Sequence, residues 1–323
     1  MKVAVVLTGA LRTIKKTIRY LKKNVLRTPD THVFACVQND TQLSEEEWTT
    51  WFNEQLGDHL KSMEWFSLEK HPEWVTHRET QLQRIQLDDG WKGYLRRSGS
   101  MIEYFQLQLA YMNMTYHEQR NNYKYDYIVR GRTDSIYAKP IDFHWLQWSD
   151  TYVADRVQAI TDELHLCKMD ATPKNILRYF MNTIISDDLL PNIQHIDADY
   201  APCETEVEPV SLMELNNYIK NGRYILTIRK NNLYVVKRSL FHLIPTLGTM
   251  YGFMRAPTAD DWWYNAECQF RSVCYYSCIT IFDYGTLYED RSVVSVHDWN
   301  EADFFDLQGN LLNSRMLYCV VRK

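Results

Sequence analysis

The chain has 323 residues, of which 45% are hydrophobic and 24% charged, and its formal net charge is -5. This composition excludes wholesale disorder, and the length is enough for one large α/β domain or two lobes. A negative net charge argues against a dedicated nucleic-acid binder. The aromatic content of 14% suits a carbohydrate site, because sugar faces stack on aromatic rings, although aromatic residues also fill cores.

The seven cysteines are odd in number and scattered, and no CxxC pair occurs. The sequence therefore predicts neither a disulfide framework nor a structural zinc site. No segment approaches the roughly 18 to 20 apolar residues that span a bilayer, so we expect no transmembrane segment and a soluble, cytoplasmic protein. The HExxH, Walker and nucleophile-elbow patterns are lacking, which argues against zinc proteases, NTPases and hydrolases.

The first elements in chain order form a βαβ unit. An apolar strand runs from Val3 to Leu7, turns at Thr8–Ala10 and leads into a helix over 13–25, and a second strand covers Val33 to Val37. Strands joined in this way predict a parallel sheet with a right-handed crossover. A further helix is expected from Glu45 to Leu56.

The helix over 13–25 is amphipathic. Its apolar residues recur at helical spacing, whereas most of the intervening residues are basic. The apolar stripe is Ile14, Ile18, Leu21 and Val25, and the basic cluster is Lys15, Lys16, Arg19, Lys22, Lys23 and Arg27. We interpret this cluster as a solvated face, and contact with a membrane or an acidic partner is the alternative.

The clearest helix comes after residues 57–97, for which no element is predicted. Ser100–Glu103 (SMIE) has the spacing of a capping box, and apolar residues then recur every three or four positions as far as Tyr116. This long helix leads into a strand that begins at Tyr127.

The second half alternates less regularly. Prolines and carboxylates are frequent near Asp187–Glu208, which predicts an excursion or lid, and a second capping box begins at Ser211. The other elements predicted are a strand at Tyr152–Ala154, a helix at Thr172–Ile185, a hairpin of Tyr224–Ile228 with Leu233–Val236, a helix at Asp261–Ser277, and strands at Val293–Val296 and Leu317–Val321.

The segment Tyr125–Tyr137 (YDYIVRGRTDSIY) combines an apolar strand with charged residues at its carboxyl end. Arg130, Arg132 and Asp134 alternate, so in extended backbone they project to one side. In open α/β sheets this edge is where ligands bind. The three groups suit a diphosphate held directly or a divalent cation held through Asp134, and the alternative is an ion pair that only orders a loop.

Three features together resemble a known group of enzymes: the opening strand and turn over 3–13, the Tyr-Asp-(apolar)3-Arg-x-Arg-x-Asp segment, and the later Asp162-Glu163-Leu164. They are similar to sugar transferases of bacterial surface-polysaccharide clusters and of large DNA viruses, which look like GT-A glycosyltransferases. The resemblance covers roughly residues 1–175.

This resemblance implies an α/β fold with a GT-A-like (Rossmann-like), mostly parallel central sheet flanked by helices and a C-terminal acceptor-side extension. Residues 1–175 are then expected to form the nucleotide-sugar (donor) half, and residues 176–323 the acceptor-side half of the same compact domain.

In GT-A enzymes an Asp-x-Asp signature at this strand end holds Mn²⁺ or Mg²⁺ on the donor diphosphate, whose negative charge grows as the glycosidic bond breaks. The matching positions here are Arg132-Thr133-Asp134, so a guanidinium replaces the first carboxylate. Either Asp134 anchors the cation alone, or Arg130 and Arg132 neutralise the diphosphate without a metal. His297 is a further candidate metal ligand, with a structural hydrogen-bonded histidine as the alternative.

The turn after the first strand is the other candidate donor site. Thr8, Gly9 and Ala10 precede a helix amino terminus, which offers backbone N–H groups to a phosphate, and Arg12 is within reach of one. Asn39 ends the second strand on the same sheet edge, where the resemblance implies base or ribose contacts. Turn formation is the alternative for Asn39.

An inverting transferase needs a carboxylate to accept the proton of the acceptor hydroxyl. Glu267 is the first candidate for this base, because it lies on a predicted helix among tryptophans that can floor a sugar site. Asp261 is the second candidate, with a helix N-cap as its simpler role. Asp162 is the third, for acceptor or donor hydroxyls.

The expected function is transfer of a hexosyl, deoxyhexosyl or pentosyl group from a nucleotide-diphospho sugar to a hydroxyl of a glycan or glycoprotein, with no nucleic-acid partner. Two rivals remain. Val129–Asp134 also resembles a stretch of GDP-fucose transferases with a GT-B fold, which predicts two Rossmann lobes and no metal dependence. The second rival is a non-catalytic carbohydrate-binding relative whose signature has decayed at Arg132.

Overall fold

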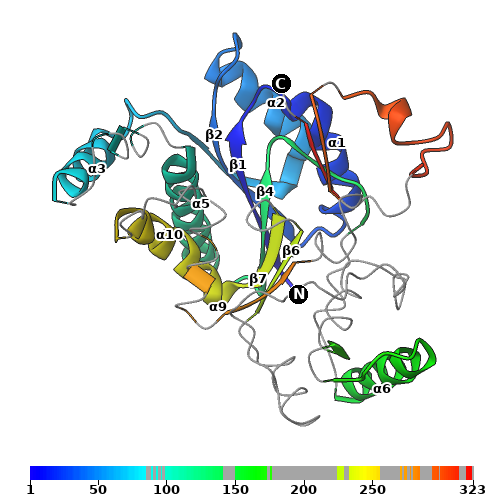
Figure 1. Cartoon of the computed structure of the whole chain (residues 1–323). Coiled ribbons are helices and arrows are strands. Elements are labelled where there is room, and N and C mark those ends of the chain that lie inside the picture. Colours follow the sequence, from blue (N-terminus) through cyan, green and yellow to red (C-terminus); the bar gives the residue numbers. More distant parts are fainter. Residues whose placement is uncertain are drawn as a thin grey trace.

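The computed structural model describes residues 1–84, 99–140, 150–172, 175–176, 224–228, 233–254, 273–274, 279–283, 293–297, 299–312 and 318–321, together with residues 89, 92–93, 96, 270 and 277. A seven-stranded sheet runs through the centre of these residues, with helices on both of its faces (Figure 1). A second, three-stranded sheet continues from one of its strands.

The central sheet is mostly parallel. Its strands, in chain order, are β1 Val3–Ala10, β2 Thr31–Gln38, β3 Leu60–Trp65, β4 Tyr127–Arg132, β6 Tyr224–Ile228, β7 Leu233–Lys237 and β8 Thr280–Asp283. They lie in the order β3-β2-β1-β4-β7-β6-β8, with β7 antiparallel to its neighbours and the others parallel to one another. The predicted α/β class, with a mostly parallel sheet flanked by helices, is confirmed.

Helices cover this sheet in two layers because the strand residues alternate between its faces. The helices are α1 Ile14–Asn24, α2 Glu45–Leu56, α3 Pro72–Arg84, α5 Gly99–Asn121, α6 Asp150–Leu166, α9 Arg238–Phe241 and α10 Leu243–Met254. Val5 and Leu7 of β1 belong to one buried cluster with α1 and α2, whereas Ala4 and Val6 belong to another with α5, α9 and α10. Both faces are therefore apolar, as expected for the central strands of a parallel sheet.

The small sheet brings the end of the chain next to β4. It consists of β5 Ser135–Tyr137, β9 Val293–Val296 and β10 Tyr318–Val321, in the order β5-β10-β9. Strand β5 starts two residues after β4 ends, and the N–H of Val321 donates to the carbonyl of Asp134 at 2.9 Å. Residues separated by almost two hundred positions thus meet at the Asp134 turn.

Several predicted elements are confirmed. The helix Glu45–Leu56 has the predicted bounds and carries a capping box between Ser44 and Glu47. The strands β6 and β7 pair as an antiparallel hairpin, and β9 has its predicted bounds. The hydroxyl of Thr172 accepts from the N–H of Asn175 at 3.2 Å, as expected at a helix start.

Other predictions are wrong. Tyr152–Ala154 is not a strand but part of α6, in which Val157, Ile160 and Leu164 are buried at helical spacing. Residues 57–97 contain β3 and α3, neither of which was predicted. The long helix α5 starts at Gly99, so Ser100 lies within its first turn and does not precede it.

Some predictions lie outside the described residues. These are the excursion near 187–208, the capping box at Ser211, and most of the helices at 172–185 and 261–277. In the part of the chain that the structure describes, no helix combines the length and the apolar character needed to cross a bilayer.

Candidate functional site

The carboxyl ends of β1 and β4 are tied together at one edge of the central sheet. Thr8 lies opposite Arg132 in the parallel register, and the N–H of Thr133 donates to the carbonyl of Thr8 at 3.1 Å. The hydroxyl of Thr133 donates to the carbonyl of Ala10 at 2.6 Å. The predicted turn at Thr8–Ala10 is therefore an extension of β1, held in place by the residue between Arg132 and Asp134.

Gly9 is required at this junction for two reasons. Its φ of +128° lies in the region that residues with a side chain rarely adopt, and a Cβ added there would lie 2.5 Å from the Thr133 hydroxyl oxygen. The backbone carbonyl of Thr133 in turn accepts a hydrogen bond from the hydroxyl of Thr17 in α1 at 2.6 Å. The two strand ends and the start of α1 thus form one fixed backbone frame.

Arg132 and Asp134 form a forked ion pair on this frame. Arg132 Nε donates to Asp134 Oδ1 at 2.8 Å, and Arg132 Nη2 donates to Asp134 Oδ2 at 2.7 Å. The two side chains are 24% and 11% exposed. The pair keeps partial access to solvent, and its two parallel charge-assisted bonds fix the guanidinium plane.

The same fork bears on the metal that the resemblance implies. A divalent cation on Asp134 would need a carboxylate oxygen as ligand, and both oxygens accept hydrogen bonds from Arg132. The guanidinium would also repel a cation at that distance. Among the described residues, no group of three or more His, Cys, Asp or Glu side chains has the arrangement of a metal site. The described residues around Asp134 do not fit a divalent cation in this arrangement.

Arg130 is buried away from the pair. Its side chain is 1% exposed, and its Nη2 donates to Glu103 Oε1 of α5 at 2.8 Å. It lies opposite the buried Tyr234 in the sheet register. Burial raises the pKa of Tyr234, so this phenol stays protonated beside the ion pair. These surroundings favour a structural role for Arg130.

Asp40 closes the turn between β1 and α1. Its Oδ1 accepts from the N–H groups of Leu11 and Arg12 at 3.0 and 3.1 Å. These are N–H groups that were expected to face a phosphate. The Arg12 guanidinium is 43% exposed and lies 3.9 Å from Asp40 Oδ2, so it is available to a ligand at the same edge. The sequence signal for Asp40 was its place just after β2.

Asn39 has the turn role that was weighed against ligand contact. Its amide Nδ2 donates to the carbonyl of Leu43 at 2.7 Å, and its Oδ1 accepts from the N–H and the hydroxyl of Thr41 at 3.1 and 2.9 Å. These bonds hold the loop between β2 and α2. These hydrogen bonds favour the turn-forming role of Asn39 over ligand contact.

His297 follows β9 and is brought to the same end of the small sheet as Asp134. Val296 pairs with Val321, whose N–H binds the carbonyl of Asp134. Two strand spacings, about 9 to 10 Å, therefore separate the backbone at Asp134 from that at Val296. The histidine is exposed.

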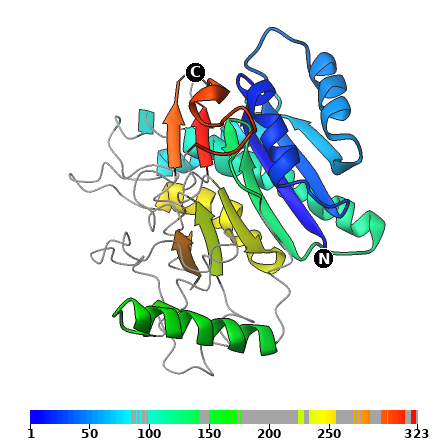
Figure 2. The same ribbon diagram turned by 90° about the vertical axis from the view of Figure 1, so that its right-hand side faces the viewer.

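Of the three candidate bases, the structure describes Asp162 alone. Asp162 lies on the exposed side of α6 and accepts from Gln158 Nε2 at 2.8 Å. Figures 1 and 2 place α6 at the end of the molecule opposite the carboxyl ends of the parallel strands. Glu267 and Asp261 lie outside the described residues.

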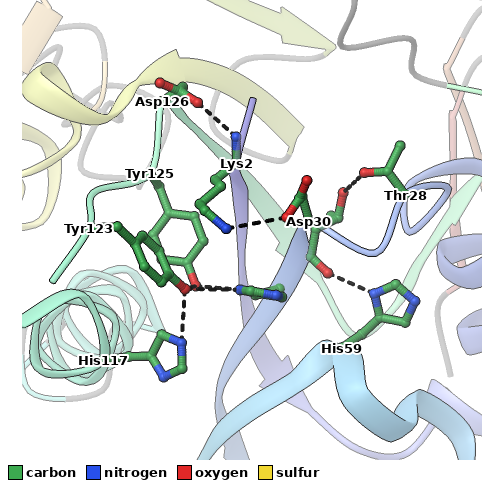
Figure 3. A network of polar contacts seen from close by, with 10 residues as sticks. Lys2, Thr28, Asp30, His59, His117, Tyr123, Tyr125 and Asp126 are labelled. Carbon is green, nitrogen blue, oxygen red and sulfur yellow. Dashed lines mark hydrogen bonds and ion pairs between the residues drawn. The ribbon is translucent and has the colours of Figure 1, made fainter. Parts of the chain in front are cut away.

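A second polar cluster lies at the amino end of the same strands and had no sequence prediction (Figure 3). The hydroxyl of Tyr123 lies 2.9 Å from His117 Nε2 and 2.9 Å from the Tyr125 hydroxyl, which lies 2.7 Å from His32 Nδ1. Burial, with Lys61 nearby, lowers the pKa of His32 to about 4. This amino-edge cluster is therefore neutral near pH 7.

No protein-family model and no curated protein sequence matches this chain. Among solved structures, core-mannan synthase A (CmsA/Ktr4) from Aspergillus fumigatus, in its Mn/GDP form, has a TM-score of 0.33 and 10% identity over 87% of this chain and 73% of that chain. The mannosyltransferase Ktr4p from S. cerevisiae in complex with GDP has a TM-score of 0.29 and 11% identity over 86% and 68%. Likeness this weak identifies no activity, so the residues of this chain have to carry the inference.

Proposed function

We propose that the protein is a GT-A-like, nucleotide-sugar-dependent glycosyltransferase that moves a sugar to a hydroxyl of a glycan or glycoprotein. In this proposal it belongs with the enzymes of bacterial surface-polysaccharide clusters and large DNA viruses. The observation that supports it best is the joined carboxyl edge of β1 and β4, where Arg132 and Asp134 lie beside the Thr8–Ala10 segment. Ligands of open α/β sheets bind at this edge.

The chemistry requires positive charge at the leaving diphosphate, because negative charge develops there as the glycosidic bond breaks. Arg132 supplies that charge in our proposal, and Asp134 orients its guanidinium through the fork. Arg12, at the start of the turn into α1, is the second cation and is 43% exposed. A bound Mn²⁺ or Mg²⁺ would supply the same neutralisation, but only after Arg132 released Asp134.

In our proposal, the two halves of the chain have different roles. Residues 1–175 supply β1, β2 and β4 and therefore the donor edge, and residues 176–323 supply the acceptor side and the base. Glu267 remains the first candidate for that base and Asp261 the second. His297 lies at the end of the small sheet and is proposed to face the donor side.

The GT-B rival is not favoured. Two Rossmann lobes would place the two halves of the chain in separate parallel sheets. In the described residues, β6, β7 and β8 from the second half of the chain lie in the same sheet as β1, β2, β3 and β4 from the first half.

A thermal-shift screen tests the proposal against a non-catalytic relative. The protein is melted with UDP-, GDP-, dTDP- and CMP-sugars in the presence of Mn²⁺, Mg²⁺ or EDTA. A ligand at about 100 times its Kd stabilises the native state by about 2.7 kcal/mol, which raises the melting temperature by several degrees. We expect one nucleotide class to do this equally well in EDTA, followed by turnover with an acceptor. If no nucleotide sugar shifts the transition, the proposal is wrong.

A further inference from the structure

The outward side of α1 is uniformly basic. Every exposed residue between positions 12 and 27 is a lysine or an arginine. These residues are Arg12, Lys15, Lys16, Arg19, Lys22, Lys23 and Arg27. The remaining side of the helix is buried in the core, including Ile14, Ile18 and Leu21. In a chain of net charge -5, this basic face of α1 is a local reversal of sign.

Acidic neighbours neutralise only part of this face. Arg19 pairs with Glu301 at 2.8 Å, Arg12 lies 3.9 Å from Asp40, and the ammonium of Lys15 lies 5.0 Å from the ring centroid of Trp48. Among the residues that the structure describes, Lys16, Lys22, Lys23 and Arg27 form no ion pair. Their charge is therefore available to an anionic surface.

A loop of mixed character, with aromatic rings and leucines as well as Glu301, Asp303 and Asp306, lies directly beside this helix. Residues 299–312 pack on α1 through Tyr20, whose ring stacks on Phe305 at 5.6 Å and whose hydroxyl donates to Glu301 at 2.8 Å. Figure 2 shows this dark red loop next to α1, with both on the side that faces the viewer.

The tip of the loop presents leucine to solvent. Asp306 Oδ1 accepts from the N–H groups of Gln308 and Asn310 at 2.9 and 2.8 Å, which fixes the turn. Leu307 at that turn is fully exposed, and Leu312 is 61% exposed. The turn therefore holds Leu307 out in solvent, whereas Phe305 of the same loop is buried against Tyr20.

We propose that the basic face of α1 and the loop over 299–312 together dock the protein on an anionic lipid bilayer. Lysine and arginine side chains are attracted to anionic headgroups, and an apolar side chain that projects beside them can enter the interface. A nucleic acid would use the charges but not Leu307. This inference goes beyond the proposed transfer reaction and does not depend on it.

Sedimentation with large unilamellar vesicles tests the docking. Vesicles of phosphatidylcholine are compared with vesicles that contain about 30% phosphatidylserine, at low salt and at about 0.5 M NaCl. We expect binding only to the anionic vesicles, weakened by salt. Each basic residue near an anionic surface contributes about fivefold in affinity, so K16E/K22E/K23E should weaken binding by roughly a hundredfold or more. Leu307→Ser should weaken it several-fold without changing the charge.

A matched control reverses three charges elsewhere. R84E/R120E/K124E has the same change in net charge. It alters exposed residues on the other face of the sheet: Arg84 of α3, Arg120 near the end of α5, and Lys124 just after α5. It should bind nearly as well as the parent, and melting curves verify that each variant is folded. Equal binding to neutral vesicles, equal loss in the control, or binding of a single-stranded oligonucleotide in place of vesicles would each overturn the proposal.

Discussion

Two polar clusters lie at opposite edges of the central sheet and differ in charge. At the amino edge, His32, Tyr123 and Tyr125 bond to one another and are neutral near pH 7. At the carboxyl edge, Arg132 and Asp134 are charged, and Arg132 is 24% exposed. A neutral network stabilises the fold, whereas an oriented charge with partial access to solvent can act on a ligand. Changes at the first edge should thus alter stability, and changes at the second should alter binding.

The largest effect is expected between the edges, at the buried pair of Arg130 and Glu103. Glu103→Leu would remove the carboxylate beside a guanidinium that is 1% exposed, so we expect a loss of about 3 to 5 kcal/mol in the free energy of unfolding. Urea denaturation measures it. The double variant Glu103→Leu with Arg130→Met should recover most of the loss, because both charges are then gone. A double variant as unstable as the single one would contradict this account.

Asp134→Ala should separate binding from stability at the carboxyl edge. Without its carboxylate partner Arg132 is no longer oriented, and we expect sugar transfer to fall by at least a hundredfold, about 2.7 kcal/mol. The melting temperature should fall less than in Glu103→Leu, because the Arg132 side chain left without this partner is 24% exposed, against 1% for Arg130. Turnover and nucleotide binding are measured side by side. Asp134→Asn is the control, since it keeps one acceptor oxygen for Arg132 and should retain more activity. Unchanged transfer in Asp134→Ala would remove the residue from the mechanism.

Gly9→Ala tests the backbone frame that supports the same edge. The positive φ and the close approach to the Thr133 hydroxyl together predict a loss of about 1 to 3 kcal/mol in stability, with weaker nucleotide binding. Gly309→Ala is a matched control, because Gly309 has a φ of +81° but nothing within 4 Å of an added Cβ. Equal losses in both variants would mean that the contact with Thr133 contributes nothing.

The smallest effect is expected from the pH dependence of the amino edge. In the folded protein the pKa of His32 is lowered to about 4, so between the unfolded value near 6.5 and about 4 the unfolded chain binds more protons. The contribution of His32 to stability is therefore present above pH 6.5 and lost as the pH falls to about 4. Denaturation from pH 7 to 4 should show a shallower slope for His32→Gln than for the parent. Identical slopes would exclude His32 as the source.

Local sequence patterns were sufficient for the elements with a strong period. The stripe of α1, the bounds of α2 and the hairpin of β6 and β7 depend on neighbours in sequence, so each was predicted correctly. The short apolar run at 152–154 was assigned wrongly because three residues do not distinguish a strand from the turn of a helix.

The position of the candidate site was predicted, but not all of its contacts, because local patterns do not specify long-range packing. That Arg132 and Asp134 stand at a strand end follows from alternation and from the apolar run before them. The bond between Arg132 and Asp134 is an ion pair of the kind that was weighed as the alternative. The bond of Arg130 to Glu103 joins β4 to α5, which no local pattern encodes.

Composition and periodicity by themselves determined that this is an α/β protein with a charged carboxyl edge, because the spacing of apolar residues indicates which residues of each helix and strand are buried. Only the tertiary structure decided which charges pair with each other, that Thr133 locks Gly9, and that the loop over 299–312 lies beside the basic face of α1. The contacts of Thr133 with the end of β1 and of the loop over 299–312 with α1 join residues that are more than a hundred positions apart. They are set by how whole layers of helices and strands pack, which the spacing of residues along the chain does not specify.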